Sequence, residues 1–312
     1  MSAVTGIEPA AVAGASAVAK SAAKALADDE KEIEVLRRLA EEKGALDPAA
    51  RAYAKRVAVK QQLRLKPWQL PGILLGVPRQ YFQNEFFDDM AERLADVPEE
   101  ELVTPRTSVA GPAMLGLGFT VEEPQLKAMY LNLLAAASDK RVQASAHPSF
   151  AEVIKQLSAS EAESLAAVLK SPLHLPIIEI RVKAATAEKP QAEGATTAAT
   201  HVLDWRNTGE QVLMPGGAMF VDNWIRLGLV TVDYASWLIA PQAYSWVDTN
   251  PEMVSARKQF DTEEFKRVEF TKGILKPTEF GRSFERVVIS SEAKALPAAK
   301  SAESAGTEDP RS

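Results

Sequence analysis

The stretch PQLKAMYLNLLAAASDKRVQASAHPSFAEVIKQLSASEAESLAAVL, from Pro124 to Leu169, carries the strongest helical pattern in the chain. Pro124 stands where a helix can begin, because the first turn of a helix does not need the amide proton that proline lacks. The apolar residues that follow recur at intervals of three and four, which is the spacing of one broad buried helix face. This face predicts a first helix and consists of Leu126, Met129, Tyr130, Leu133, Leu134 and Ala137.

Two more helices are predicted after a polar break at 138–145. Pro148 opens the second helix, and its buried stripe consists of Phe150, Val153, Ile154 and Leu157. Ser158 and Glu161 have the S-x-x-E spacing of a capping box, which predicts the start of a third helix. Its inward residues are Ala162, Leu165, Ala166 and Leu169, and Pro172 ends it. Helices this short are not stable alone in water, so we expect the three to pack on one another.

The same stretch resembles the abortive infection alpha (Abi-alpha) family. The resemblance lies in the order and spacing of Leu126–Leu134, Ala135–Asp139, His147-Pro148-Ser149-Phe150 and Ile154-Lys155-Gln156-Leu157-Ser158 with Glu161. Looser agreement extends it from about Val59 to Ile289. It implies a bacterial protein linked to phage resistance, and it transfers no catalytic residue, because the family has none established. We call eight residues the signature residues and expect them to be mainly structural: Asn132, His147, Pro148, Phe150, Gln156, Leu157, Ser158 and Glu161.

Composition narrows the class of protein. The chain has 312 residues, a net charge of −6 and a pI of about 5.4. An acidic balance weighs against nucleic acid as the main partner, because dedicated nucleic-acid binders are usually basic. The absence of cysteine excludes disulfides and cysteine-ligated metal sites. No apolar run is long enough to cross a bilayer. We expect a cytoplasmic protein without cofactor or metal.

The order of predicted elements suggests how the chain is divided. We expect 1–27 to be disordered or a frayed Ala-rich helix, 28–146 to be a helical domain, and 290–312 to be a disordered tail. From 147 to 289 the order helix, helix, strand, helix, strand, strand, helix is typical of a winged helix, with long loops at 184–210 and 235–264. The predicted fold is mainly α with a small β component: N-terminal helices and a helix bundle, then a winged-helix-like C-terminal domain.

A helix predicted to begin at Asp47-Pro48 is the most cationic segment of the chain. One interpretation is contact with a partner or an anionic surface, either lipid or nucleic acid. The other is a solvated helix face that pairs with acidic helices nearby. Its basic residues, with no acid among them, are Arg51, Lys55, Arg56, Lys60, Arg64 and Lys66.

The residues of the chain give little support to a DNA-binding or an enzymatic function. In a winged helix the segment Pro215–Leu227 would enter the major groove, but its only polar residues are Asp222, Asn223 and Arg226, which is a weak basis for reading bases. The three histidines show no H-E-x-x-H spacing, and no G-x-S-x-G occurs. The best candidate for a hidden catalytic cluster is Asn132, His147 and Glu161.

These observations favour a non-enzymatic phage-defence protein that acts by binding another macromolecule. A phage protein, a host protein and self-association all stay open as partners. The second hypothesis is a winged-helix DNA-binding regulator. The third is a peripheral membrane protein that uses the Ala-rich N-terminus and the basic helix Arg51–Lys66.

Overall fold

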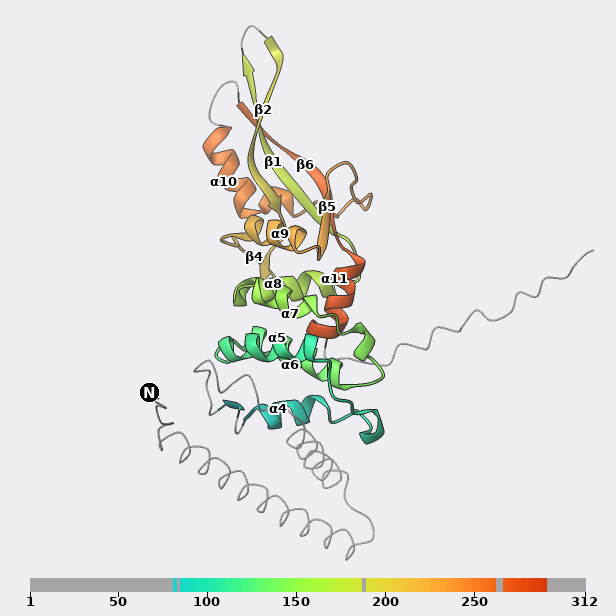
Figure 1. Cartoon of the computed structure of the whole chain (residues 1–312). Helices are drawn as coiled ribbons and strands as arrows, with labels where there is room; N and C mark the ends of the chain where they lie inside the picture. The colour runs from blue at the N-terminus through green and yellow to red at the C-terminus, as the bar shows by residue number, and fades with distance from the viewer. Residues whose placement is uncertain (1–80, 83–84, 187–188, 262–265, 291–312) are drawn as a thin grey trace, which may run out of the picture. The chain divides into compact units, whose positions relative to one another are not determined.

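A computed structural model of the chain describes residues 81–82, 85–186, 189–261 and 266–290 (Figure 1). They fall into two compact units, one holding the described residues up to Glu100 and the other those from Glu101 onward. The expected boundary between 146 and 147 lies within the second unit. The Ala-rich segment 1–27, the basic helix Arg51–Lys66 and the tail after Ser290 lie outside the described residues.

In the first unit, helix α4 (Glu85–Arg93) buries Phe86 and Met90. Tyr81 donates a hydrogen bond to Asp89 Oδ2 at 2.8 Å. The pKa of Tyr81 is raised, mainly because the side chain is buried and also because its hydroxyl is bonded to the carboxylate of Asp89. The short helix η1 (Glu99–Glu101) follows.

The second unit begins with a helical layer: α5 (Thr107–Phe119), α6 (Pro124–Ser138), η2 (Gln143–Ser145), α7 (Ser149–Lys155) and α8 (Ala159–Lys170). All six apolar residues predicted to line α6 are buried. Tyr130 fixes the approach of two helices, because a Cβ on Gly116 of α5 would lie only 2.2 Å from Tyr130 Cζ. Three helices from Pro124 to Leu169 were predicted to pack on one another; the structure has all three, and α6 packs on both α7 and α8.

The capping box is also confirmed. The Ser158 hydroxyl accepts from Glu161 N–H, and Glu161 Oε2 accepts from Ser158 N–H, both at 3.3 Å. Two amide protons that a helix start leaves unpaired are thus satisfied at the joint between α7 and α8.

A four-stranded antiparallel sheet follows the helical layer in the second unit. Its strands are β1 (Leu175–Thr186), β2 (Lys189–Val202), β5 (Val230–Asp233) and β6 (Lys266–Pro277), in the order β2-β1-β6-β5. One face of the sheet packs on Trp246, Met253 and their neighbours, around helices η3 (Val247–Thr249) and α10 (Pro251–Phe260). The other face carries charge, including a 2.6 Å ion pair between Lys183 and Glu269.

The winged-helix prediction is wrong. Segment 184–210 was expected to be a surface loop, but β2 pairs with β1 along most of its length, and only the short hairpin β3 (Arg206–Asn207)–β4 (Glu210–Gln211) follows. The second expected loop, 235–264, contains η3 and α10. The resulting curled four-stranded sheet with covering helices differs from the small wing of a winged helix. The Ala/Thr/Gly composition was misleading because an edge strand needs backbone pairing and few apolar side chains.

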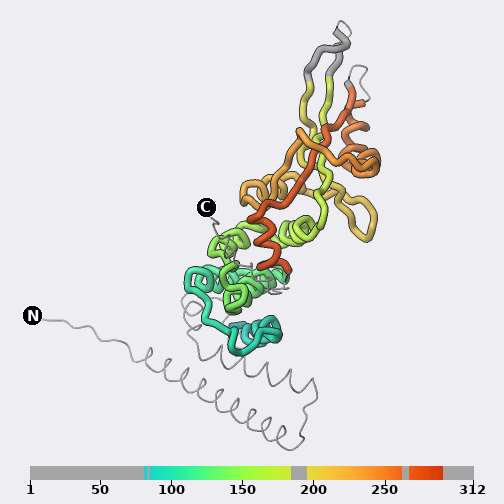
Figure 2. Tube along the Cα trace, turned by 90° about the vertical axis from the view of Figure 1, so that its right-hand side faces the viewer, coloured from blue at the N-terminus to red at the C-terminus, as the bar shows by residue number. Residues whose placement is uncertain are grey.

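The C-terminal helices return to the helical layer. Helix α11 (Glu279–Phe284) and the single π-helical turn η4 (Glu285–Ile289) follow β6, and Figure 2 shows this red segment lying among the green helices. Asn132 Nδ2 of α6 donates to the Val288 carbonyl at 2.9 Å. The Phe284 ring, fully buried, lies 5.4 Å from the Phe150 ring of α7. Helices α11 and η4 thus pack on helices that lie about 150 residues before them in the sequence.

Within the described part of the chain, no helix combines the length and the apolar character needed to cross a membrane.

Candidate functional site

The apolar signature residues belong to the core. Phe150 and Leu157 are buried, and the Phe150 ring packs against the rings of Phe280 and Phe284. Pro148 is the residue directly before α7. These positions are explained by packing and by helix initiation.

The three residues proposed as a hidden cluster have different partners. Asn132 binds η4, as described above. His147 is exposed, and its Nδ1 accepts from Ser149 N–H at 3.2 Å and lies 2.6 Å from Ser149 Oγ, so it caps the start of α7. Glu161 closes the capping box of α8. Each side chain therefore serves its own helix or joint.

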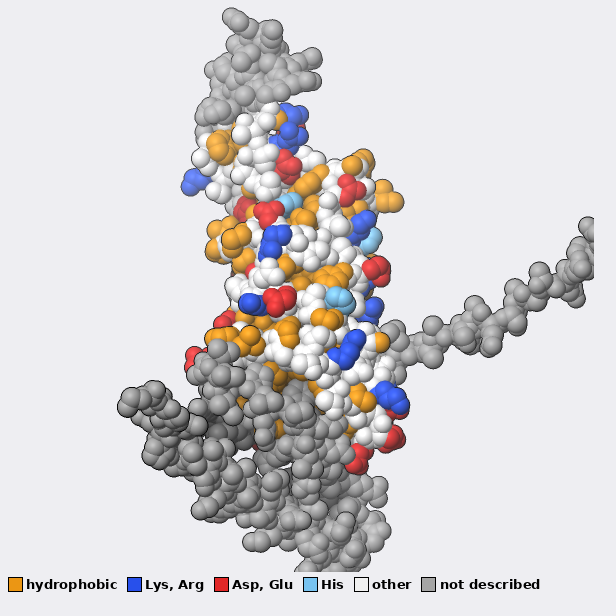
Figure 3. Space-filling view, in the orientation of Figure 1, with side chains coloured by type: hydrophobic (Ala, Val, Ile, Leu, Met, Phe, Trp, Pro, Cys, Tyr) orange, Lys and Arg blue, Asp and Glu red, His pale blue; other side chains and the backbone are white. Residues whose placement is uncertain are grey.

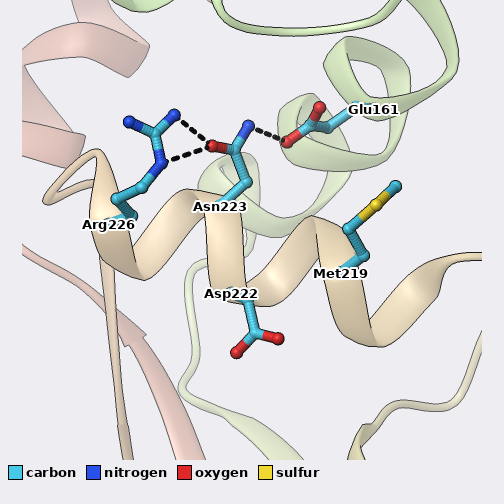
Figure 4. A pocket seen from close by; sticks show the side chains of 5 residues that line it. All are labelled: Glu161, Met219, Asp222, Asn223 and Arg226. Atoms are coloured by element: carbon cyan, nitrogen blue, oxygen red, sulfur yellow. Dashed lines mark hydrogen bonds between the residues drawn. The ribbon is translucent and has the colours of Figure 1, made fainter.

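The polar signature residues Gln156 and Glu161 meet helix α9 (Gly217–Arg226) in what we call the α8–α9 seam. Asn223 is its centre (Figure 4). The Asn223 amide nitrogen donates to the Gln156 carbonyl at 3.0 Å and to Glu161 Oε1 at 2.7 Å. Its oxygen accepts two bonds from the Arg226 guanidinium, at 3.1 and 2.5 Å. The amide has two donors and two acceptor sites, so its capacity is fully used.

Arg226 completes the seam. Its NH1 donates to Gln156 Oε1 at 2.9 Å, so the guanidinium bridges α9 and the end of α7. Glu161 is only 5% exposed, and each of its two oxygens accepts a bond from within the protein. A buried carboxylate is tolerated when it is hydrogen-bonded in this way. The seam thus fixes how α9 is oriented against α7 and α8.

An open pocket of about 400 Å³ lies beside the seam. It is lined by Glu161, Met219, Asp222, Asn223 and Arg226. Figure 4 shows the Asp222 carboxylate pointing away from the Asn223–Glu161 contact. It also shows that Met219 and Arg226 lie toward opposite ends of α9. The Met219 side chain is 63% exposed.

A second polar network joins α9 to the sheet. His201 at the end of β2 places Nε2 3.2 Å from Asp222 Oδ1 and Nδ1 3.1 Å from the Tyr234 hydroxyl. The Tyr234 hydroxyl also accepts from His201 N–H, and the two rings stack at 6.0 Å. His201 has a φ of 55°, in the left-handed region that few non-glycine residues occupy. Burial raises the pKa of Tyr234 to about 12.

Most polar groups of these two networks are engaged within the protein. Among the described residues, no group of three or more His, Asp or Glu side chains is arranged to hold a metal ion. Asn223 and Arg226, which the winged-helix hypothesis assigned to DNA, are engaged by α7 and α8. The raised pKa of Tyr234 opposes its use as a nucleophile near neutral pH. The part of α9 that faces solvent presents Met219, Asp222 and Ile225.

Sequence reasoning did not foresee either network. Gln156 and Arg226 are 70 residues apart, and Asp222 meets His201 only because 189–202 is a strand. For Glu161, the signal available in the sequence was the S-x-x-E spacing with Ser158. The basic residues Arg51, Lys55, Arg56, Lys60, Arg64 and Lys66 lie outside the described residues, so that predicted contact surface stays a prediction.

Comparison with known proteins gives one match. A family model described as abortive infection alpha matches residues 78–288, about two thirds of the chain. No curated protein and no solved structure matches the chain. The matched range contains every signature residue and both units' described elements up to η4. The chain belongs to the abortive infection alpha family.

Proposed function

We propose that this protein is a phage-defence component of the abortive-infection type that acts by binding another macromolecule and performs no chemistry of its own. Membership of the abortive infection alpha family carries the proposal. The partner is a phage protein, a host protein or a second copy of the chain.

The α8–α9 seam supports binding in preference to chemistry. Polar groups in a catalytic site must be available to substrate, at least through a water molecule. Here the Asn223 amide and both Glu161 oxygens are bonded within the protein. Their evident role is to hold α9 in one orientation.

The exposed side of α9 is our proposed binding face. Met219 is 63% exposed, and Asp222 lies next to it on the rim of the pocket. A flexible thioether adapts to irregular apolar partners, and a helix that is already fixed loses little entropy when it binds. These features fit a protein partner that contributes an apolar side chain to the pocket.

The defence proposal is tested by expressing the full-length protein in a bacterial host and challenging the cells with a broad phage panel. We expect lower burst sizes, fewer plaques and early death of infected cells. If all three measurements match those of cells carrying an empty vector for every phage, the defence proposal fails.

The binding face is tested separately with Met219→Glu. A charge on this exposed side chain should leave the melting temperature unchanged but abolish protection, because an apolar partner cannot accept it without a counter-charge. Leu173→Glu is the matched control, since Leu173 is 74% exposed on a different segment. If Met219→Glu protects cells as well as the wild type does, the binding face lies elsewhere.

A further inference from the structure

The loop that follows β5 has an unusual composition and exposure. No charged residue occurs between Asp233 and Asp248. At its tip, Trp237 is 58% exposed and Ile239 is 93% exposed, whereas Leu238 between them packs against the core. The loop projects sideways from the sheet beyond β5 (Figure 1), and hydrophobic side chains gather on that edge in the space-filling view (Figure 3).

The loop is held in place by hydrogen bonds. The Tyr244 hydroxyl accepts from Leu238 N–H at 3.1 Å and donates to the Gly273 carbonyl of β6 at 2.8 Å. At its start, Ala235 N–H donates to Asp233 Oδ1 at 2.8 Å. These bonds hold the backbone at Leu238, whose side chain packs inward while those of Trp237 and Ile239 are exposed. The apolar tip is therefore displayed by a fixed scaffold.

Lys272 of β6 borders the loop, and Lys276 lies further along the same strand. The Lys272 ammonium lies 5.2 Å from the centre of the Tyr244 ring, and Lys276 is the partner of Thr231 in the β5–β6 ladder. Both lysines lie on exposed positions. An uncharged segment that exposes Trp and Ile beside a lysine has the composition of segments that sit at the boundary between lipid headgroups and acyl chains.

We propose that the loop 234–246 is an anchor for an anionic lipid surface. Trp237 and Ile239 enter the boundary between headgroups and acyl chains, and Lys272 and Lys276 meet anionic headgroups. A protein partner fits less well, because two side chains on a projecting tip offer far less than the roughly 800 Å² per partner that a stable protein interface buries. This surface is separate from the α9 face proposed above.

The test is sedimentation of the full-length protein with lipid vesicles, of pure phosphatidylcholine or with added phosphatidylglycerol. We expect the wild type to bind vesicles that contain phosphatidylglycerol. Trp237→Ser with Ile239→Ser should bind on the order of tenfold or more weakly, because apolar area drives insertion. Leu213→Ser with Val254→Ser is the matched control, since these exposed side chains lie outside the loop, and it should bind like the wild type.

Charge and depth give independent measurements. Lys272→Glu with Lys276→Glu should weaken binding to anionic vesicles, and added salt should reduce the difference from the wild type. Brominated acyl chains should quench tryptophan fluorescence in the wild type and much less in Trp237→Phe, which keeps an apolar ring.

The proposal is overturned if the wild type binds no vesicles, or if the loop double variant binds as the wild type does. Loss of phage defence in a double variant whose vesicle binding is intact would also overturn it and would assign the loop to a protein partner. Met219→Glu separates the two proposals, because it should leave vesicle binding unchanged whatever it does to defence.

Discussion

Asn223 joins two helices through an amide that has no spare capacity. Its nitrogen lies 2.7 Å from a carboxylate oxygen of Glu161, so a second carboxylate at this position would face the first one. We expect Asn223→Ala to lower the free energy of unfolding by about 1.5–3 kcal/mol, the range for hydrogen bonds to charged groups. Asn223→Asp should cost more, because it adds repulsion between two partly buried carboxylates.

Urea unfolding measures both variants. The expected order of midpoints is wild type, then Asn223→Ala, then Asn223→Asp, with similar slopes. Lowering the pH until carboxylates are protonated should narrow the gap between the two variants. Equal stability of Asn223→Asp and the wild type at neutral pH would show that the 2.7 Å contact does not form in solution.

The raised pKa of Tyr234 predicts how the stability of the protein changes at alkaline pH. Burial raises its pKa from 10.0 to about 12, so the folded state holds this proton more tightly than the unfolded state does. Its contribution to stability is therefore complete below about pH 10 and is lost as the pH rises through 12. In a spectrophotometric titration of the native protein, Tyr234→Phe should remove a phenolate signal near pH 12. Removal of a signal near pH 10 would instead show an exposed phenol.

At the scale of elements, the close packing of α5 on α6 requires that residue 116 be a glycine, which has no side chain. A Cβ on Gly116 would lie 2.2–2.6 Å from two ring atoms and the hydroxyl oxygen of Tyr130, and that side chain is buried. Gly116→Ala should therefore lower the free energy of unfolding by about 1–3 kcal/mol, the usual cost of overpacking a core. Thermal or urea unfolding measures the effect.

Gly111 on the same helix is the matched control. A Cβ at Gly111 meets no atom within 4 Å. Its gain in helix propensity is opposed by the restriction that Pro112 places on the preceding residue, so Gly111→Ala should stay within about 1 kcal/mol of the wild type. If both alanine variants have the same stability, α5 and α6 do not approach as closely as the structure shows.

The helices could be predicted from sequence because their information is local. The spacing of Leu126, Tyr130 and Leu133 and the pair Ser158–Glu161 each specify structure within one or two turns. β2 could not be predicted in this way. Its Ala and Thr side chains are largely exposed at 195–200, and its order comes from pairing with β1. Because β2 could not be predicted, the contact between His201 at its end and Asp222 could not be predicted either.

At the scale of the whole molecule, the winged-helix prediction failed because strand partners are set by non-local pairing. The predicted order of elements omitted β2, the β3–β4 hairpin, η3 and α10. What the order could not give is the sheet order β2-β1-β6-β5, in which the last strand lies between the first and the third in sequence. The seam is non-local in the same way, since Asn223 of α9 is 67 residues from Gln156 and 62 residues from Glu161 in the sequence.

The helical layer also depends on contacts between residues far apart in the sequence, which the C-terminal helices α11 and η4 provide. Phe284 and Val288 are fully buried against helices that begin about 150 residues earlier, and Asn132 binds the Val288 carbonyl. A chain ending at Pro277 should therefore lose cooperative unfolding of the helices as well as its last two elements. Phe284→Ala in the full chain should cost about 3–5 kcal/mol, as expected for a large buried ring.

A chain ending at Ser290 is the control, because it keeps every residue of α11 and η4. We expect its melting temperature to match that of the full chain, whereas the chain ending at Pro277 should show a broad or absent thermal transition by circular dichroism. Amide hydrogen exchange should show the loss of protection first in α6 and α7, which these helices contact. If α6 and α7 keep their protection in the shorter chain, the helical layer holds together without its C-terminal closure.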